Sequence, residues 1–258
     1  MNVAVCVKQI PDSEPPALDP QHHTLVRDGR LVMDESDSFG VEMGLQLVEA
    51  AGGGEVVLVS MAPCGETRGL RTALATGAAK AILVSDPVLA GSDALGTAKV
   101  LAAVIRRLGP DLVLAGTEST DGYTGTTPVQ VAELLGWPSV SFARHVEISH
   151  RALRVKRQTE TGYEEVTCPL PAVVTVTAGV VEPRYPSFKG LAAAKSKPVE
   201  ELTVVELGLD PSQVGFSGAR QQVISVRAVK AREAGEIVVD AGEAHERVIS
   251  FLEQLKIL

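Results

Sequence analysis

The chain has 258 residues, of which 45% are hydrophobic and only 3% aromatic, so one large or two modest domains can bury a core of Val, Leu and Ala. Its formal net charge of −8 provides no cationic surface for polyanions, which argues against nucleic acid as a partner. The N-terminus has no basic region before a long apolar stretch, and no segment reaches the roughly 18 apolar residues of a membrane span, so we expect a cytoplasmic protein.

The first half of the chain alternates short apolar runs with helix-like stretches. Each run is nearly continuous rather than alternating, as in strands that are covered on both faces. The runs are NVAVCVK (2–8), EVVLVS (55–60), KAILVS (80–85) and DLVLAG (111–116). This order predicts right-handed crossovers and an open parallel sheet with helices on both faces, an α/β fold.

The helix predicted before the fourth run is the most clearly delimited. Ser92 is placed to cap its N-terminus, and Gly109 followed by Pro110 ends it.

After about residue 138 the pattern changes to short alternating strands. A turn around Thr161 and Gly162 predicts an antiparallel ribbon that extends the sheet. Residues 182 to about 223 are rich in Pro, Gly, Ser and Lys and have little periodicity, which predicts an extended C-terminal arm or long loop. A final amphipathic helix follows, with Val248, Leu252 and Leu255 on one stripe.

Small hydroxyl residues and glycines are concentrated directly after the fourth run, in STDGYTGTTP (119–128). In an open parallel sheet, ligands bind beyond the carboxyl ends of the strands, where the strand order reverses. Thr127 can cap the following helix and Pro128 suits its first turn, while free amides there favour an anion. The predicted phosphate cradle consists of Gly122, Thr124, Gly125, Thr126 and Thr127. It contains no lysine, and a simple turn with a helix cap is the alternative.

The common nucleotide and catalytic motifs are absent from the sequence. No G-x-G-x-x-G follows the first strand and no G-x-x-x-x-G-K-[ST] occurs, which argues against a dinucleotide dehydrogenase and a P-loop NTPase. Cys6, Cys64 and Cys168 are widely spaced without a metal-ligand pattern, so we interpret them as small buried hydrophobes. The five histidines are scattered, and we predict neither catalytic nor metal-binding residues.

Five stretches, in order along the chain, carry a resemblance to a known family. They are VAVCVKQIPD, TLVRDGRLVMDESDSFGVEMGLQL, RGLRTALATGAAKAILV, AGTESTDGYTGTTPVQVAELLGWPSV and the long run from LRVKRQTETGYEEV to EPRYPSFKGLAAAKSKP. Together they resemble the beta subunit of electron transfer flavoproteins, the FixA-like group, from residue 1 to about 225. The resemblance implies a Rossmann-like fold of the adenine nucleotide alpha hydrolase type.

The resemblance also implies the function of an electron carrier subunit, not an enzyme. Such a subunit pairs with a larger alpha subunit that carries the redox FAD. The heterodimer takes electrons from flavin dehydrogenases, such as the acyl-CoA dehydrogenases of fatty acid β-oxidation, and passes them toward a quinone reductase. The beta subunit itself holds AMP, or a second FAD in electron-bifurcating members.

Positions that align with the family's nucleotide contacts follow the first, second and fourth strands or precede the first long helix. They are Cys6, Lys8, Asp34, Asp37, Met61, Gly116, Asp121, Gly122, Thr124, Gly125, Thr126 and Thr127. Where the family often has an amide-rich run, this chain has residues 123–126, so hydroxyls and backbone amides would have to bind the phosphate. The resemblance therefore leaves AMP and a second FAD as alternatives.

The segment after Tyr185 resembles the family's recognition loop for partner dehydrogenases. Leu191 would be its apolar anchor, flanked by Lys189, Lys195 and Lys197, although packing of Leu191 on its own chain is the alternative. We therefore expect a nucleotide-binding domain with its ribbon in 1–182 and a C-terminal arm with docking loop and final helix in 183–258.

Two other functions on the same fold are less consistent with the sequence than the carrier. A free-standing adenine-nucleotide sensor, resembling universal stress proteins, would account for residues 1–140 but leaves the ribbon and the EPRYPSFKG segment without a role. An ATP pyrophosphatase needs a Ser-Gly-Gly loop after the first strand, and KQIPDSEPP is not one.

Overall fold

The structure is a computed structural model that describes residues 1–258 except 13–16, 63–64, 150–151, 228, 231–234 and 236. The described residues group into two compact units, Met1–Ile224 and Ser225–Leu258. Residues 183–224, which the sequence predicts to be part of the C-terminal arm, belong to the first of these units, while a domain boundary at 182 stays a prediction.

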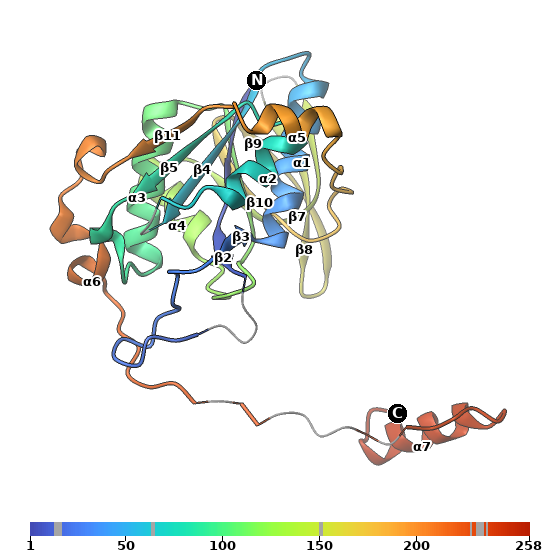
Figure 1. Cartoon of the computed structure of the whole chain (residues 1–258). Coiled ribbons are helices and arrows are strands. Elements are labelled where there is room, and N and C mark those ends of the chain that lie inside the picture. Colours follow the sequence, from blue (N-terminus) through green and yellow to red (C-terminus); the bar gives the residue numbers. More distant parts are fainter. Residues whose placement is uncertain (13–16, 63–64, 150–151, 228, 231–234, 236) are drawn as a thin grey trace. The chain divides into compact units, whose positions relative to one another are not determined.

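A mixed, mostly parallel sheet forms the centre of the first unit (Figure 1). Its nine described strands follow the order β11-β5-β4-β1-β6-β10-β7-β8-β9. The strands in parallel pairs include β1 (Asn2–Cys6), β4 (Glu55–Ala62), β5 (Lys80–Ser85), β6 (Leu112–Gly116), β10 (Ala172–Val176) and β11 (Val199–Leu202). Each of the four predicted apolar runs is one of these strands, which confirms the predicted fold class. Because β1 pairs with β4 on one side and β6 on the other, the strand order reverses beside β1.

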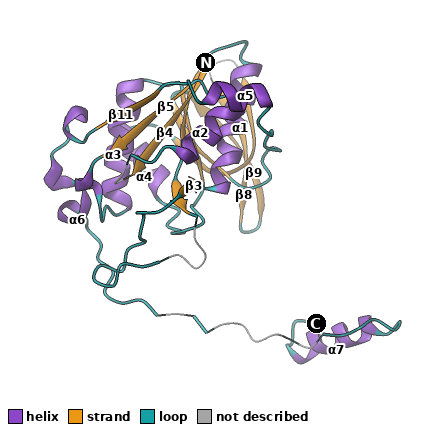
Figure 2. Ribbon diagram, in the orientation of Figure 1, coloured by secondary structure: helices purple, strands orange, loops and turns teal. Residues whose placement is uncertain are grey.

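Helices cover both faces of the sheet, as predicted (Figure 2). Successive side chains of a strand point to opposite faces, and β1 shows this directly. Val3 and Val5 pack in one cluster with α1 (Glu35–Ala50) and α2 (Arg68–Thr76). Ala4 packs in the other cluster with α3 (Ala94–Leu108) and α4 (Thr127–Leu135).

Two predicted helix caps are each displaced by one residue. Asp93, not Ser92, is the N-cap of α3, because its carboxylate accepts a hydrogen bond from the Gly96 amide at 2.8 Å. The predicted end of this helix at Gly109, in the left-handed conformation, is confirmed. Thr127 is the first residue of α4 rather than its cap, a position that Thr126 occupies without a side-chain capping bond.

The predicted antiparallel ribbon is present beyond β10. It consists of β7 (Ser139–Ser149), β8 (Ala152–Thr159) and β9 (Gly162–Pro169), and Thr159 pairs with Gly162 across the turn. The buried strand β10 is not part of the ribbon but lies between β6 and β7, parallel to both.

A small antiparallel sheet lies between β1 and α1 in the chain. It pairs β2 (Gln9–Pro11) with β3 (Leu31–Met33). The segment that connects them contains an isolated bridge between Leu18 and Leu25.

Residues 183–224 contain more regular structure than the long loop we expected. They form α5 (Phe188–Ala194), β11, two short 3-10 turns, η2 (Val205–Leu207) and η3 (Pro211–Gln213), and α6 (Gly215–Gly218). A further 3-10 turn, η1 (Pro87–Leu89), precedes α3. The sequence pattern does not predict β11, because this short edge strand has exposed Glu200 and Glu201 and only Leu202 buried.

The second unit contains the predicted final helix, α7 (Ala244–Gln254). None of its residues is buried, and Val248 and Leu255 are exposed. In the described part of the chain, no helix combines the length and apolar character that crossing a membrane requires.

Candidate functional site

A cavity of about 1300 Å³ opens beyond the carboxyl ends of β1, β4 and β6. Cys6, Met61 and Gly116, the residues that end or nearly end these strands, lie in its wall. This is the point where the strand order reverses, the place at which such sheets bind ligands.

Most residues predicted to contact a nucleotide line this one cavity. They are Cys6, Lys8, Asp37, Met61, Gly116, Asp121, Gly122, Thr124, Gly125 and Thr127. Asp34 and Thr126 are not in its wall. The role of each residue as a nucleotide contact stays a prediction, but the structure brings the predicted set together from four separate parts of the chain.

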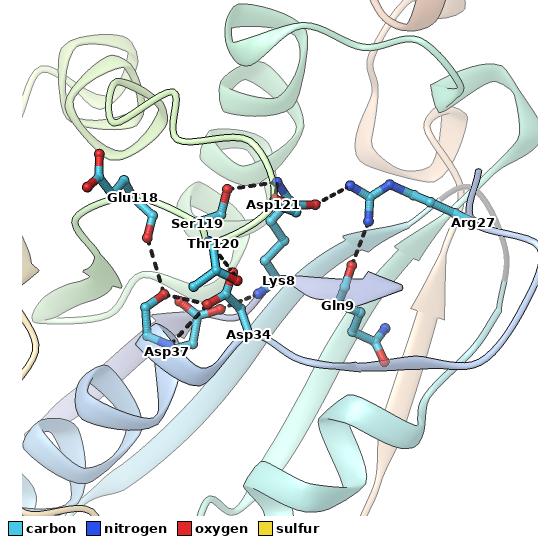
Figure 3. A network of polar contacts seen from close by, with 10 residues as sticks. Lys8, Gln9, Arg27, Asp34, Asp37, Glu118, Ser119, Thr120 and Asp121 are labelled. Atoms are coloured by element: carbon cyan, nitrogen blue, oxygen red, sulfur yellow. Dashed lines mark hydrogen bonds and ion pairs between the residues drawn. The ribbon is translucent and has the colours of Figure 1, made fainter. Parts of the chain in front are cut away.

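Lys8 supplies the positive charge that the loop 117–126 lacks in its own sequence. Its Nζ donates hydrogen bonds to Ser119 Oγ at 3.0 Å and to Asp121 Oδ1 at 2.5 Å (Figure 3). A Cβ added at Gly122 would lie 3.6 Å from the Lys8 ammonium. The lysine therefore sits directly beside the glycine backbone of the predicted cradle.

Asp121 binds a second cation that the sequence did not single out. Its Oδ2 accepts a hydrogen bond from Arg27 Nη2 at 2.6 Å (Figure 3). Burial alone would raise the pKa of Asp121, but the hydrogen bonds and charge of Lys8, together with Arg27, hold it below its usual range. Asp121 is therefore a carboxylate that fixes two cations at the cavity wall.

Asp34 holds the cradle loop from behind the cavity wall. It is fully buried. Its Oδ1 accepts bonds from the amide and hydroxyl of Ser36 at 3.0 and 2.8 Å, and its Oδ2 from the amide and hydroxyl of Thr120 at 2.8 and 3.1 Å. Asp34 therefore links the N-terminus of α1 to the loop after β6.

Asp37 is a buried carboxyl at the inner end of the cavity. Burial raises its pKa to about 7, and the charge of Asp34 adds to this, against the backbone hydrogen bonds from Lys8 and Gly116. The Lys8 amide donates to its Oδ2 at 2.6 Å. Burial, with the charge of Asp37, also raises the pKa of the neighbouring Cys6 thiol to about 12, so this thiol stays protonated.

Replacing Asp37 with asparagine is expected to change how stability depends on pH. The folded chain holds the Asp37 proton more tightly than the unfolded chain, whose carboxyl has a pKa of 3.8. The protonated Asp37 carboxyl therefore contributes most to the free energy of unfolding below about pH 4. This contribution falls as the pH rises to about 7, by at most about 1.4 kcal/mol per pH unit. Urea unfolding of both proteins from pH 4.5 to 7.5 should show D37N gaining relative to the original chain, and a constant difference would contradict this.

The glycines of the cradle allow a ligand to approach the backbone. Gly125 has φ of 66°, in the left-handed region that favours glycine. The exposed Glu118 lies near it, since a Cβ at Gly125 would be 3.6 Å from the Glu118 carboxylate. The loop thus combines open backbone with one nearby, solvent-screened negative charge.

Two further segments line the cavity, and neither was expected from the sequence. One is the loop around His22, and the other consists of Phe216 in α6 and the segment 219–223 that follows this helix. The rings of His22 and Phe216 are 4.5 Å apart, centroid to centroid. No local pattern could signal this pair, because its members come from opposite ends of the first unit.

A second cavity, of about 730 Å³, is lined in part by the loop after β6. Thr117, Glu118 and Ser119 belong to the walls of both cavities. Two aromatic residues of the second wall, Tyr123 and Phe142, have positive φ angles of 49° and 62°, which bulky residues rarely adopt.

The predicted docking residues lie on or beside α5. Leu191 is 47% exposed, and both Lys189 and Lys195 are exposed. Phe188, which is not among the predicted docking residues, lies three residues before Leu191 and is 94% exposed. Lys197 does not serve as a surface charge, because its Nζ donates to the Leu74 and Ala78 carbonyls at 2.8 and 2.6 Å.

The other chemically notable side chains are placed as follows. Cys168 is buried, as predicted, whereas Cys6 is partly exposed to the cavity and Cys64 lies outside the described residues. Over the described ranges, no group of three His, Cys, Asp or Glu side chains could hold a metal ion.

Comparisons with known proteins indicate the same family over most of the chain. A family model described as the electron transfer flavoprotein domain matches residues 23–207. The electron transfer flavoprotein subunit beta of Thermoanaerobacterium thermosaccharolyticum is 35% identical over 257 residues, 99% of this chain and 98% of the relative. The caffeyl-CoA reductase-Etf complex subunit CarD of Acetobacterium woodii is 31% identical over 240 residues, 92% of each chain. The match to the subunit beta of Mycobacterium tuberculosis is 39% identical over 141 residues and spans about half of that protein, 53%.

Proposed function

The chain belongs to the electron transfer flavoprotein family, among its beta subunits, and from this premise we propose that it is the beta subunit of a heterodimeric electron carrier. In this proposal an alpha subunit carries the redox FAD. The pair accepts electrons from flavin dehydrogenases, such as acyl-CoA dehydrogenases, and delivers them toward a quinone reductase. This chain binds an adenine nucleotide and provides the docking segment.

The observation that carries the proposal is the cavity beyond β1, β4 and β6. It has room for a nucleotide, and its wall combines the glycine backbone at 122 and 125 with the ammonium of Lys8. Amides of the loop and the first turn of α4 suit a phosphate, and Lys8 adds a charge-assisted hydrogen bond. The residues present therefore fit a phosphate-bearing adenine nucleotide, either AMP or a second FAD.

The residues of this chain bind and orient rather than react. Asp34 and Asp121 tie α1 and Lys8 to the cradle loop, so the cradle keeps its shape. When bound in the partner subunit, the flavin supplies the redox chemistry, and the protein sets its surroundings and its approach to the donor. In this proposal the chain does not carry out the redox step itself. It keeps the nucleotide site in shape and guides the approach of the electron donor to the flavin.

The docking part of the proposal rests on the segment around α5. Leu191 and Phe188 present apolar surface beside the exposed Lys189 and Lys195. An apolar anchor with charges around it favours fast and transient encounters with a partner protein. We assign contact with dehydrogenases to this surface.

Nucleotide content is the test of the proposed function. The chain is purified alone and co-expressed with a candidate alpha subunit, each sample is denatured, and the released nucleotides are identified by mass spectrometry. We expect a stable heterodimer with AMP from this chain and one FAD per pair. Two FAD per pair would place a second flavin in the cavity instead. A self-sufficient homo-oligomer that binds adenine nucleotide would favour the free-standing sensor, and no nucleotide at all would contradict the assignment of the cavity.

A further inference from the structure

The helix α5 of the docking segment has little that holds it in place within its own sequence. It is seven residues long, which is too short for a helix to be stable by itself in water. Of these seven described residues, Ala194 alone is buried. Gly190 lies so close to α2 that its backbone almost touches the Ala75 carbonyl. The position of α5 therefore depends on its packing against α2 (Figure 1).

Two cations join α5 and α2 in opposite directions. Arg71, on α2, donates through Nη1 to the carbonyls of Ala194 and Lys197 at 2.8 and 2.6 Å. Lys197, just beyond α5, donates through Nζ to the carbonyls of Leu74 and Ala78 at 2.8 and 2.6 Å. The last carbonyls of a helix have no partner within that helix, and they attract cations. Each segment thus supplies a cation to the C-terminal end of the other, and we call Arg71 and Lys197 the α2–α5 latch.

The latch holds the docking surface without belonging to it. Phe188 and Leu191 are exposed on α5, whereas both latch side chains are partly buried and their donors face backbone carbonyls. An apolar anchor on a helix that is already fixed loses little conformational entropy when a partner covers it. Without the latch, the short helix would have to be ordered at each encounter, so binding of the partner would weaken.

We propose that Arg71 and Lys197 are positioning residues for electron transfer, which hold Phe188 and Leu191 in the orientation that a partner dehydrogenase binds. The inference rests on the proposed function and adds to it two residues that set the affinity of the docking step. It requires that loss of the latch raise KM for the dehydrogenase while the limiting rate of electron transfer stays unchanged.

The test compares Arg71→Met and Lys197→Met with the original chain, each in its complex with the alpha subunit. Arg106→Met is the matched control, because Arg106 also joins two helices, donating from α3 to the Leu134 carbonyl near the end of α4 at 2.7 Å, away from the docking segment. Hydrogen exchange measures the order of residues 186–198. Stopped-flow reduction of the flavin, at increasing concentrations of a reduced acyl-CoA dehydrogenase, separates KM from the limiting rate.

We expect both latch variants to speed hydrogen exchange in residues 186–198 at least about tenfold, because hydrogen bonds from charged groups are lost. We expect KM for the dehydrogenase to rise about fivefold or more, with flavin content and limiting rate unchanged. The Arg106→Met control should change neither exchange in this segment nor KM. Lys197→Arg keeps a cation at the end of α2 and should return KM to within about twofold of the original value, which keeps the test decisive if Lys197→Met does not fold.

The other outcomes contradict the inference in distinguishable ways. Faster exchange in α5 with unchanged KM would show that the latch holds the helix without aiding docking. A lower limiting rate or a lower flavin content at unchanged KM would show a general effect on the fold, which also overturns the positioning role. If the original complex accepts no electrons from the dehydrogenase, the proposed function itself fails. If Phe188→Ala slows transfer but the latch variants do not, the inference alone fails.

Discussion

Alanine at Phe188 is expected to lower kcat/KM for electron transfer from a partner dehydrogenase by roughly thirtyfold, the effect of losing an interface anchor worth about 2 kcal/mol. Phe188 is almost fully exposed on a helix that is held firmly in place. Ser187 caps α5 through the Gly190 amide at 3.0 Å, and Gly190 packs so closely on α2 that a Cβ would lie 2.3 Å from the Ala75 carbonyl oxygen. Because the helix is already fixed and a phenylalanine side chain has only two rotatable bonds, little entropy is lost when a partner covers it.

The same measurement applies to Leu191, the anchor predicted from the sequence. Leu191→Ala should also slow transfer, but by less, because about half of this side chain is already covered. Stopped-flow reduction by the dehydrogenase measures both variants, and flavin content should not change. Val205→Ala serves as the control, since Val205 is an exposed apolar residue on η2, away from the docking segment. If both α5 variants accept electrons at the original rate, this surface is not the docking site.

Replacing Arg184 with methionine is expected to destabilise the chain by about 2 kcal/mol, because it leaves the buried carboxylate of Glu42 without its partner. Arg184 Nε and Nη2 donate to Glu42 at 2.7 and 3.0 Å, and Nη1 donates to Glu49 at 2.9 Å. Glu42 is 4% exposed. The expected loss of stability is smaller than the about 3–5 kcal/mol of fully buried pairs because the Arg184 side chain is 36% exposed.

Urea unfolding measures the Arg184 effect, with Arg107→Met as the matched control. Arg107 pairs with Glu200 at 2.8 Å, but both side chains are about half exposed, so its loss should cost less than about 0.5 kcal/mol. Adding Glu42→Gln to Arg184→Met should recover part of the lost stability. Equal effects of the two arginine substitutions would show that burial of Glu42 does not set the cost.

The sequence predicted those parts of the fold that depend on local pattern. The strands of the first half are continuous apolar runs, and their pattern alone indicates burial on both faces. The place of the loop after β6 at the cavity was predictable because glycines and hydroxyls follow a buried strand directly, while its role as a phosphate cradle stays a prediction. The residue-level caps were less certain, since Ser92 and Asp93 both suit a helix N-terminus and only the structure shows which carboxylate or hydroxyl faces the free amides.

The parts that failed depend on contacts between distant segments. Nothing in the sequence around Arg27 predicts its ion pair with Asp121, because Asp121 lies 94 residues further along the chain. Lys197 belongs to a lysine-rich stretch that indicates solvent, yet its ammonium satisfies carbonyls at the end of α2. The edge strand β11 has too few buried residues to show a strand pattern.

The interleaved strand order leaves some strand edges unpaired while the chain is being synthesised. Strands β1, β4, β5 and β6 leave the ribosome first and can already pair with one another. The outer edge of β6 stays open until residues 172–176 arrive, and that of β5 until residues 199–202 arrive. Until then the nascent chain presents unpaired, strongly apolar strand edges, which other chains can extend. The interval between synthesis of β6 and β11 is therefore the period in which this protein most needs protection from aggregation.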